Sequence, residues 1–200
     1  MLSALGSLHT GRLVLTTVDP LQAADQAMTK ALLGEIGLAG ARRNADTGFA
    51  AGAALGSLVA FTGCAVQFDG PETATADSGP WIEIPPATAT PRLLWGRNTR
   101  PPRCQDCGTA LRIWRERLAA PDELADLPGR SCDAGLSLRC DTCGTEAAVH
   151  RWRWGRHAGA GRSFVLIEEV FPGEARPLPP LMQALTELGA GPWSFFYVQD

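Results

Sequence analysis

The sequence contains few of the side chains on which enzyme active sites depend. Only three of its 200 residues are histidines, and it has no Gly-rich phosphate loop, no nucleophile elbow and no H-E-x-x-H motif. Glu168 and Glu169 are adjacent, and neighbouring residues of a strand point to opposite faces, so they make a poor catalytic pair. The sequence therefore predicts no catalytic residue. An enzyme whose site in the body of the protein carries no recognisable motif stays an alternative.

The chain also lacks a long run of strongly apolar residues. Residues 47–68 carry no charge, but many of them are Ala, Gly, Ser and Thr, and a membrane helix needs about 20 predominantly apolar residues. We interpret this stretch as a Gly/Ala-rich loop that leads into a buried strand. Residues 1–15 lack the basic start and apolar run of a secretory signal. The sequence thus predicts a cytoplasmic protein without membrane contact.

Lysine is almost absent, because the basic residues are 17 arginines and a single lysine, Lys30. This bias indicates a GC-rich, bacterial genome and carries no mechanistic information. The net charge of −3 argues against a protein that binds polyanions with its whole surface. The charge is uneven, since residues 92–162 carry +5 and the remainder carries −8. A modestly basic segment therefore lies within an acidic body.

Outside the cysteine-rich segment, the hydrophobic pattern predicts two helices and several strands. An Asp-Pro step at residues 19–20 predicts the start of the first helix, with Asp as N-cap, and Gly37 or Gly40 its end. A Pro-Pro step at residues 179–180 predicts the start of the second helix, and Gly189 its end. The expected strands cover residues 12–18, 58–68, 81–84, 92–95, 163–171 and 193–198.

This order of elements predicts an α+β fold. It is compatible with a two-layer sandwich, of which the ferredoxin-like arrangement is one form. A chain of 200 residues, 45% of them hydrophobic, is long enough to bury a core without metal or disulfides throughout. We expect residues 1–96 and 156–200 to form the α+β body and residues 97–155 to form an inserted all-β unit.

Two nearly identical heptapeptides contain four of the six cysteines. Residues 103–109 read RCQDCGT and residues 139–145 read RCDTCGT. Two residues between paired cysteines let the chain turn so that both sulfurs face one ion, and two such turns can place four thiolates tetrahedrally. Each pair is followed by a glycine, which tolerates the positive φ that such a turn requires. The predicted metal ligands are Cys104, Cys107, Cys140 and Cys143.

The segment resembles a zinc ribbon in these four cysteines. After each pair the sequence is strand-like, TALRIWRE and TEAAVHRWRW, and a metal-binding turn followed by a strand, repeated, is the plan of that family. The resemblance covers about a quarter of the chain and implies Zn²⁺ as cofactor. It departs from the common pattern because 32 residues separate the two pairs, whereas about 15–20 is usual.

Other uses of the paired cysteines are iron–sulfur binding, disulfides or redox chemistry. Four cysteines can hold an iron–sulfur cluster, but cytosolic chains seldom keep disulfides, and no strand precedes a helix here as in a redox C-x-x-C. Four thiolates leave no open position for water, so the predicted zinc is structural. The remaining two cysteines have plainer interpretations: Cys64 as a small buried hydrophobe and Cys132 as a bystander or substitute ligand.

Arginine and tryptophan alternate in residues 150–154, HRWRW, and mix in residues 112–117, RIWRER. Exposed tryptophans beside arginines can stack on bases and neutralise phosphates. The simpler interpretation is that the tryptophans pack the small inserted unit and the arginines are solvated. The candidate nucleic-acid contacts are Arg112, Arg115, Arg151, Trp152 and Arg153.

Taken together, these patterns predict a non-enzymatic protein with a structural four-cysteine zinc ribbon that acts through contacts with an unknown protein partner. The alternative is a nucleic-acid-binding zinc-ribbon protein that uses the Arg/Trp-rich segment. The acidic pI of about 5.6 argues against strong nonspecific affinity for DNA.

Overall fold

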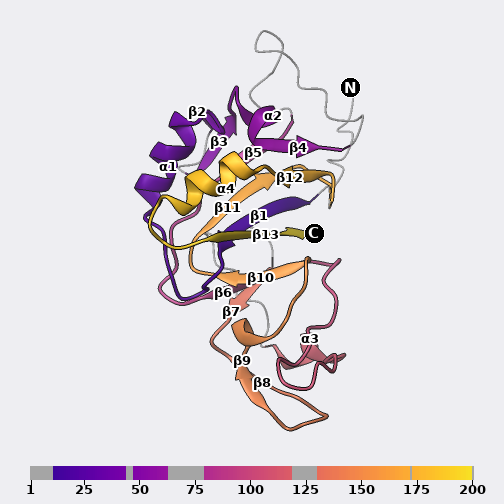
Figure 1. Cartoon of the computed structure of the whole chain (residues 1–200). Helices are drawn as coiled ribbons and strands as arrows, with labels where there is room; N and C mark the ends of the chain where they lie inside the picture. Colours follow the sequence, from indigo (N-terminus) through magenta and orange to yellow (C-terminus); the bar gives the residue numbers. More distant parts are fainter. Residues whose placement is uncertain (1–10, 44–46, 63–78, 119–129, 172, 200) are drawn as a thin grey trace, which may run out of the picture.

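The computed structural model describes residues 11–43, 47–62, 79–118, 130–171 and 173–199. This part of the chain is mixed α/β, mostly strands, with four short α-helices and several antiparallel sheets (Figure 1). The predicted α+β class is therefore confirmed. Cys64 and the second half of the strand expected at 58–68 lie outside the described residues.

The largest element is a six-stranded antiparallel sheet, called the large sheet below. The two strands predicted at 12–18 and 163–171 are adjacent inner strands of this sheet, with Leu13 opposite Ile167 and Leu15 opposite Val165. In spatial order the strands are β13 (Trp193–Val198), β1 (Arg12–Thr17), β11 (Phe164–Glu168), β5 (Trp81–Glu83), β3 (Gly48–Ala51) and β2 (Ala39–Arg42).

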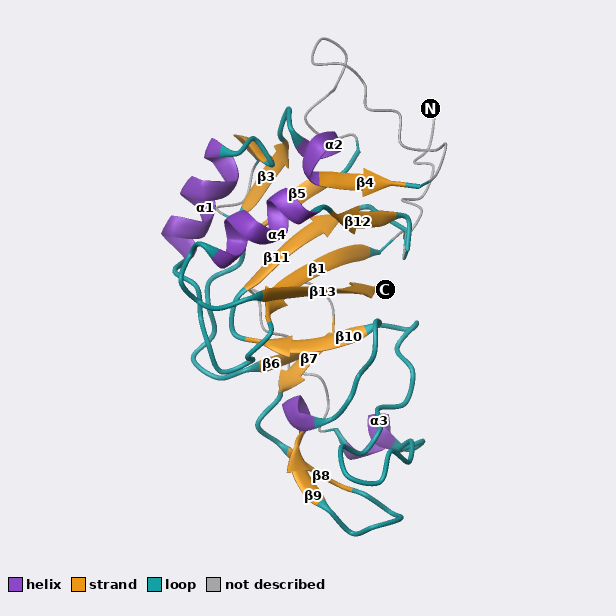
Figure 2. Ribbon diagram, viewed as in Figure 1, coloured by secondary structure: helices purple, strands orange, loops and turns teal. Residues whose placement is uncertain are grey.

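At β1 and β11 both faces of the large sheet are covered, so residues pointing to either face of these strands are buried. Helices α1 (Gln26–Glu35) and α4 (Pro179–Thr186) lie on one face (Figure 2), where Leu33 and Leu185 join the strand side chains Leu13 and Ile167 in one core. On the opposite face the apolar side chains pack against Leu94 of a second sheet; they are Val14, Phe164, Leu166, Phe196 and Val198.

That second sheet, the small sheet, connects the large sheet to the cysteine-rich segment. It consists of β10 (Ala158–Gly161), β6 (Arg92–Trp95) and β7 (Arg130–Asp133). Below it in Figure 2 lie α3 (Trp114–Arg117), the hairpin of β8 (Ser137–Arg139) and β9 (Glu146–Ala148), and a 3-10 turn at Val149–Arg151. At the opposite end, α2 (Leu55–Leu58) leads into β4 (Val59–Phe61), which pairs with β12 (Ala175–Pro177).

The start of the first helix differs from its prediction. Asp19 does not cap it, because its Oδ1 accepts a hydrogen bond from the Leu21 amide 3.0 Å away and the Asp-Pro step forms a turn. The helix begins at Gln26, where the Asp25 side chain accepts from the Met28 amide. Its end is as predicted, since Gly37 follows it with φ +74°.

Residues 47–62, from the uncharged stretch, form β3, α2 and β4. Within the described ranges, no helix has the length and apolar character needed to span a bilayer.

Candidate metal centre

The two heptapeptides adopt the same turn, called a knuckle below. In the first knuckle the Cys104 amide donates to Thr109 O at 2.9 Å, and the Gly108 amide donates to Cys104 O at 3.0 Å. The second repeats both bonds, from the Cys140 amide to Thr145 O at 2.8 Å and from the Gly144 amide to Cys140 O at 3.0 Å. Both glycines have φ +73°, the left-handed region that favours glycine over any other residue. The repeated sequence thus encodes a repeated backbone.

The four knuckle sulfurs converge on one point. Cys104 Sγ lies 3.7 Å from Cys143 Sγ, and Cys107 Sγ lies 3.6 Å from Cys140 Sγ. All four sulfurs lie within 4.8 Å of one another. The first cysteine of each pair is buried and the second is exposed. The predicted ligand set is therefore arranged to hold a metal ion, with one side of the site in the protein interior and the other toward solvent.

Each knuckle ends in a threonine that interacts with the exposed cysteine two residues before it. The hydroxyl and amide of Thr145 lower the pKa of the Cys143 thiol to about 6, and Thr109 likewise lowers the pKa of Cys107. At Cys104 the hydrogen bond with the Cys107 backbone lowers the pKa of the thiol. Burial and the neighbouring sulfurs raise it, and the net result is a pKa of about 11. The pKa shifts thus make the exposed thiols of Cys107 and Cys143 easier to ionise than the buried thiol of Cys104.

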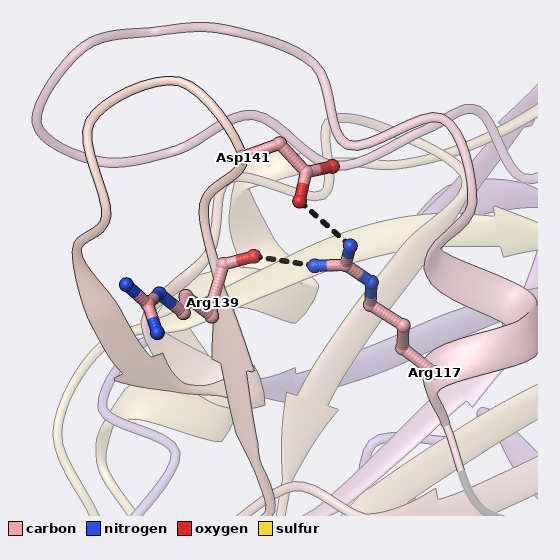
Figure 3. A network of polar contacts seen from close by, with 3 residues as sticks. All are labelled: Arg117, Arg139 and Asp141. Carbon is pink, nitrogen blue, oxygen red and sulfur yellow. Dashed lines mark hydrogen bonds and ion pairs between the residues drawn. The ribbon is translucent and has the colours of Figure 1, made fainter.

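Polar side chains tie the two knuckles together. Thr145 Oγ1 donates to Asp106 Oδ2 at 2.8 Å, which joins the second knuckle to the first. Arg117, the last residue of α3, donates to Arg139 O at 2.8 Å and to Asp141 Oδ1 at 2.6 Å on the second knuckle (Figure 3). These links hold the two pairs of sulfurs in one arrangement.

Arginines also surround the first knuckle. Arg103 Nη1 donates to Gly108 O at 3.1 Å, and Arg153 Nη2 donates to Gln105 O at 3.0 Å. The two arginines are cross-strand neighbours, since their backbones pair with each other. Two like charges opposite each other are unfavourable by themselves, but four thiolates around a divalent ion carry a net charge of −2. The guanidinium groups supply the opposite charge near that site.

Sequence reasoning missed these supporting residues, although the repeated threonine was a visible signal. Arginine, both cysteines, glycine and threonine are the five residues that the two heptapeptides share. Asp106, Arg117 and Arg153 gave no comparable signal, because their contacts depend on how the knuckles and α3 lie in space.

The segment is not all-β, contrary to the prediction. After the first knuckle only Ala110 forms a bridge, and the chain then enters α3; after the second, β9 ends at Ala148 and a 3-10 turn follows. The tryptophans of the segment, Trp114, Trp152 and Trp154, lie in a core that they share with Trp95 of β6. Trp114 lies edge-to-face against Trp154 at 5.1 Å and against Trp95 at 6.1 Å.

This second core contains the two buried cysteines of the knuckles. Cys104 and Cys140 pack with Trp114, Trp152 and Leu138. The described residues between 97 and 155 are called the cysteine lobe below. The core of the cysteine lobe and the four knuckle sulfurs are therefore contiguous.

The five candidate nucleic-acid contacts have different environments. Arg112 and Arg151 are exposed, and Arg153 is exposed while it holds the first knuckle. Arg115 stacks on the Trp114 ring at 4.8 Å and donates to Thr99 O at 3.2 Å. Trp152 is only 4% exposed, and its Nε1 donates to Ala147 O at 3.2 Å. Its ring is therefore covered by protein atoms.

Other potential ligands lie away from the four sulfurs. Cys132 is buried on β7 opposite Leu93, and it is not part of the sulfur cluster. His150 Nδ1 lies 2.9 Å from Ala134 O, and His157 Nδ1 lies 3.1 Å from the Asn98 amide nitrogen. Among the described residues, the four knuckle cysteines are the group arranged to bind a metal.

Comparison with models of protein families, with curated proteins and with solved structures finds no match to this chain.

Proposed function

We propose that the four cysteines bind one structural zinc ion. The observation that carries this proposal is the sulfur spacing. Four zinc–sulfur bonds of about 2.3 Å in a tetrahedron require sulfurs about 3.8 Å apart, and the two sulfur–sulfur distances across the knuckles are 3.7 and 3.6 Å. An iron–sulfur cluster distributes its cysteines over several irons, which spreads the sulfurs further than the 4.8 Å found here.

A structural role follows from the ligand set. Four thiolates complete the coordination of zinc, so water has no open position at which zinc could activate it. Two of the ligands belong to the core of the cysteine lobe, whose tryptophans need the knuckles in place to pack. Zinc therefore contributes folding free energy, typically about 10–16 kcal/mol of apparent binding for small sites of this kind.

X-ray absorption at the zinc edge tests this proposal. The purified, reduced protein should show four sulfur neighbours at about 2.3 Å and no light-atom neighbour. Nitrogen or oxygen neighbours beside the sulfurs would contradict a closed site of four thiolates. An iron absorption edge with iron–iron scattering would show that the site holds an iron–sulfur cluster and not zinc.

We further propose that the chain is a ferredoxin-like body with residues 97–155 as an insert. The support is the order of strands around the two helices. Helix α1 and the segments after it connect β1 to β5, and β11 lies between these two strands. Helix α4 connects β11 to β13, and β1 lies between those two. Two such split βαβ units are the plan of that fold. The β2–β3 hairpin then extends the sheet beyond β5.

Within this arrangement we propose that the protein is non-enzymatic and acts through contacts with a protein partner. The support is negative charge on the body and the presence of a metal site that shapes structure without offering a reactive position. The body, residues 1–96 and 156–200, carries a net charge of −5, so its partner is expected to present a basic surface.

The second candidate function is nucleic-acid binding by the cysteine lobe. It is favoured by the exposed arginines Arg112, Arg151 and Arg153, and disfavoured by the burial of Trp152, because a covered ring cannot stack on a base. Fluorescence anisotropy with single-stranded RNA and DNA at increasing salt tests it. This candidate predicts that binding weakens as salt is added. It also predicts that an Arg112→Glu/Arg151→Glu variant loses binding while an Arg176→Glu variant of the body keeps it, and these results would favour it over the first candidate.

A further inference from the structure

An open apolar groove runs between α1 and α4 on the outer surface of the body. Its volume is about 300 Å³. The apolar part of the lining comes from both helices, and Met28 is 58% exposed. An exposed methionine is adaptable and is common at surfaces that bind peptides. The lining residues are Met28, Ala31, Leu32, Glu35, Ala184, Glu187 and Leu188.

The charged part of the groove has one sign. Glu35 and Glu187 line it, and no basic side chain among the described residues does. Glu35 is the last residue of α1, and Glu187 is the C-cap of α4. Glu187 Oε1 accepts a hydrogen bond from Gln183 Nε2 at 3.2 Å, which does not neutralise its charge.

Both glutamates lie where a helix disfavours an acidic side chain. The C-terminal end of a helix carries partial negative charge, so Lys, Arg or His is favoured there. Neither α1 nor α4 has a basic residue in its last turn. Both helices therefore have acidic residues at their C-terminal ends, at the border of one apolar groove. This shared exception indicates that the positive charge these ends favour comes from another molecule.

We propose that this groove binds a basic amphipathic segment of a partner protein, which places apolar side chains against Met28 and Leu188 and Lys or Arg side chains against Glu35 and Glu187. The proposal rests on the proposed function of acting through protein contacts and assigns that function to a surface. The charge complementarity includes the two helix ends as well as the carboxylates. An anionic membrane or a nucleic acid would be repelled by the same charges.

Methyl NMR with a designed probe tests the proposal. The probe is a helical peptide of leucine and lysine with leucines at i, i+3, i+4 and i+7, and its twin carries glutamate in place of every lysine. The ε-methyl signal of Met28 should move with the lysine peptide and stay unchanged with the glutamate peptide. Met182, which is half-buried against the core, provides a reference signal.

A charge-removing pair of variants separates local from general attraction. Glu35→Gln/Glu187→Gln should bind the lysine peptide roughly three- to tenfold more weakly at low salt, as expected for two exposed ion pairs. The control, Glu116→Gln/Glu146→Gln, removes the same charge from exposed positions of the cysteine lobe and should bind as the wild type does.

Four outcomes would overturn the proposal. The first is a Met28 methyl signal that does not move when the lysine peptide is added, and the second is a signal that moves equally with both peptides. The third is an equal loss of peptide affinity in the two double variants. The fourth is a Met28 signal that moves with protein concentration alone, which would assign the groove to a second copy of the chain. Zinc content measured on the same samples is independent of these outcomes, because the groove lies outside the cysteine lobe. A failure of the groove is thereby distinguished from a failure of the metal site.

Discussion

At the scale of single residues, the two cysteines of each knuckle have different roles. Cys104 and Cys140 are 1% and 3% exposed and belong to the core of the cysteine lobe, whereas Cys107 and Cys143 are exposed and hydrogen-bonded to threonines. Removing an exposed ligand therefore tests metal binding with little direct change to packing.

Cys107→Ser is expected to abolish stoichiometric metal binding and to unfold the cysteine lobe locally, since the remaining three thiolates no longer close the site. Metal content and amide hydrogen exchange measure the two effects. Cys132→Ser is the matched control, because Cys132 is a buried cysteine outside the cluster, and it should keep its metal. Metal retained at wild-type level in the Cys107 variant would contradict the assignment.

Glu83 provides a pH-dependent prediction. Burial raises the pKa of its carboxyl group, against the opposing effects of Arg12 and of Thr47. In the pH range between the unfolded pKa and this raised value the folded state binds more protons, so the contribution of Glu83 to stability falls as pH rises.

Glu83→Gln removes this dependence. The free energy of unfolding of wild type minus that of the variant should therefore decrease between about pH 4 and pH 7, as measured by urea denaturation at each pH. A difference that increases with pH would mean that Arg12 outweighs burial at this site.

At the scale of elements, the central strands and the C-terminal helix could be predicted because their sequences carry strong signals. Leu13, Val14 and Leu15 place apolar side chains on both faces of β1, and the Pro-Pro step does start α4 at Pro179. The start of α1 could not be predicted, because two aspartates, Asp19 and Asp25, compete as caps and the choice depends on where the chain leaves β1.

Strand β10 could not be predicted for a different reason. Its sequence, AGAG, has low β-propensity. It pairs with β6 and passes close to the large sheet: a Cβ at Gly159 would collide with the Phe196 ring, and one at Gly161 would collide with Thr16. Glycine is required there by tertiary packing, which no local pattern reveals.

The cap of α1 gives a prediction at this scale. Asp25→Ala should lower the free energy of unfolding by about 1 kcal/mol, because the Met28 amide loses its acceptor at 2.8 Å. Asp19→Ala should cost less, because its bond to the Leu21 amide lies in an exposed turn. Urea denaturation of both variants checks this, and a larger cost for Asp19 would restore the helix start predicted from the sequence.

At the scale of the whole molecule, the two largest cores are separated by a smaller one between the large and the small sheet. The first packs α1 and α4 on the large sheet, and the second contains the buried knuckle cysteines Cys104 and Cys140. The four metal-ligand cysteines could be predicted, because two short C-x-x-C-G segments identify them without any knowledge of the fold. The tryptophan core and the polar links between knuckles could not, because they join residues that meet only in the fold.

Metal removal should therefore separate the two cores. A chelator under reducing conditions is expected to increase hydrogen exchange in the cysteine lobe while the central strands β1 and β11 stay protected. Exchange mass spectrometry before and after chelation measures this. Loss of protection in β1 and β11 at the same chelator concentration would show that the metal holds the entire fold and not one lobe.

The central claim is that the two heptapeptides jointly hold one zinc ion through Cys104, Cys107, Cys140 and Cys143. Elemental analysis of the purified, reduced protein tests it most directly. We expect one zinc per chain and no iron. Protein that is folded by circular dichroism, fully reduced and free of bound metal would contradict the claim.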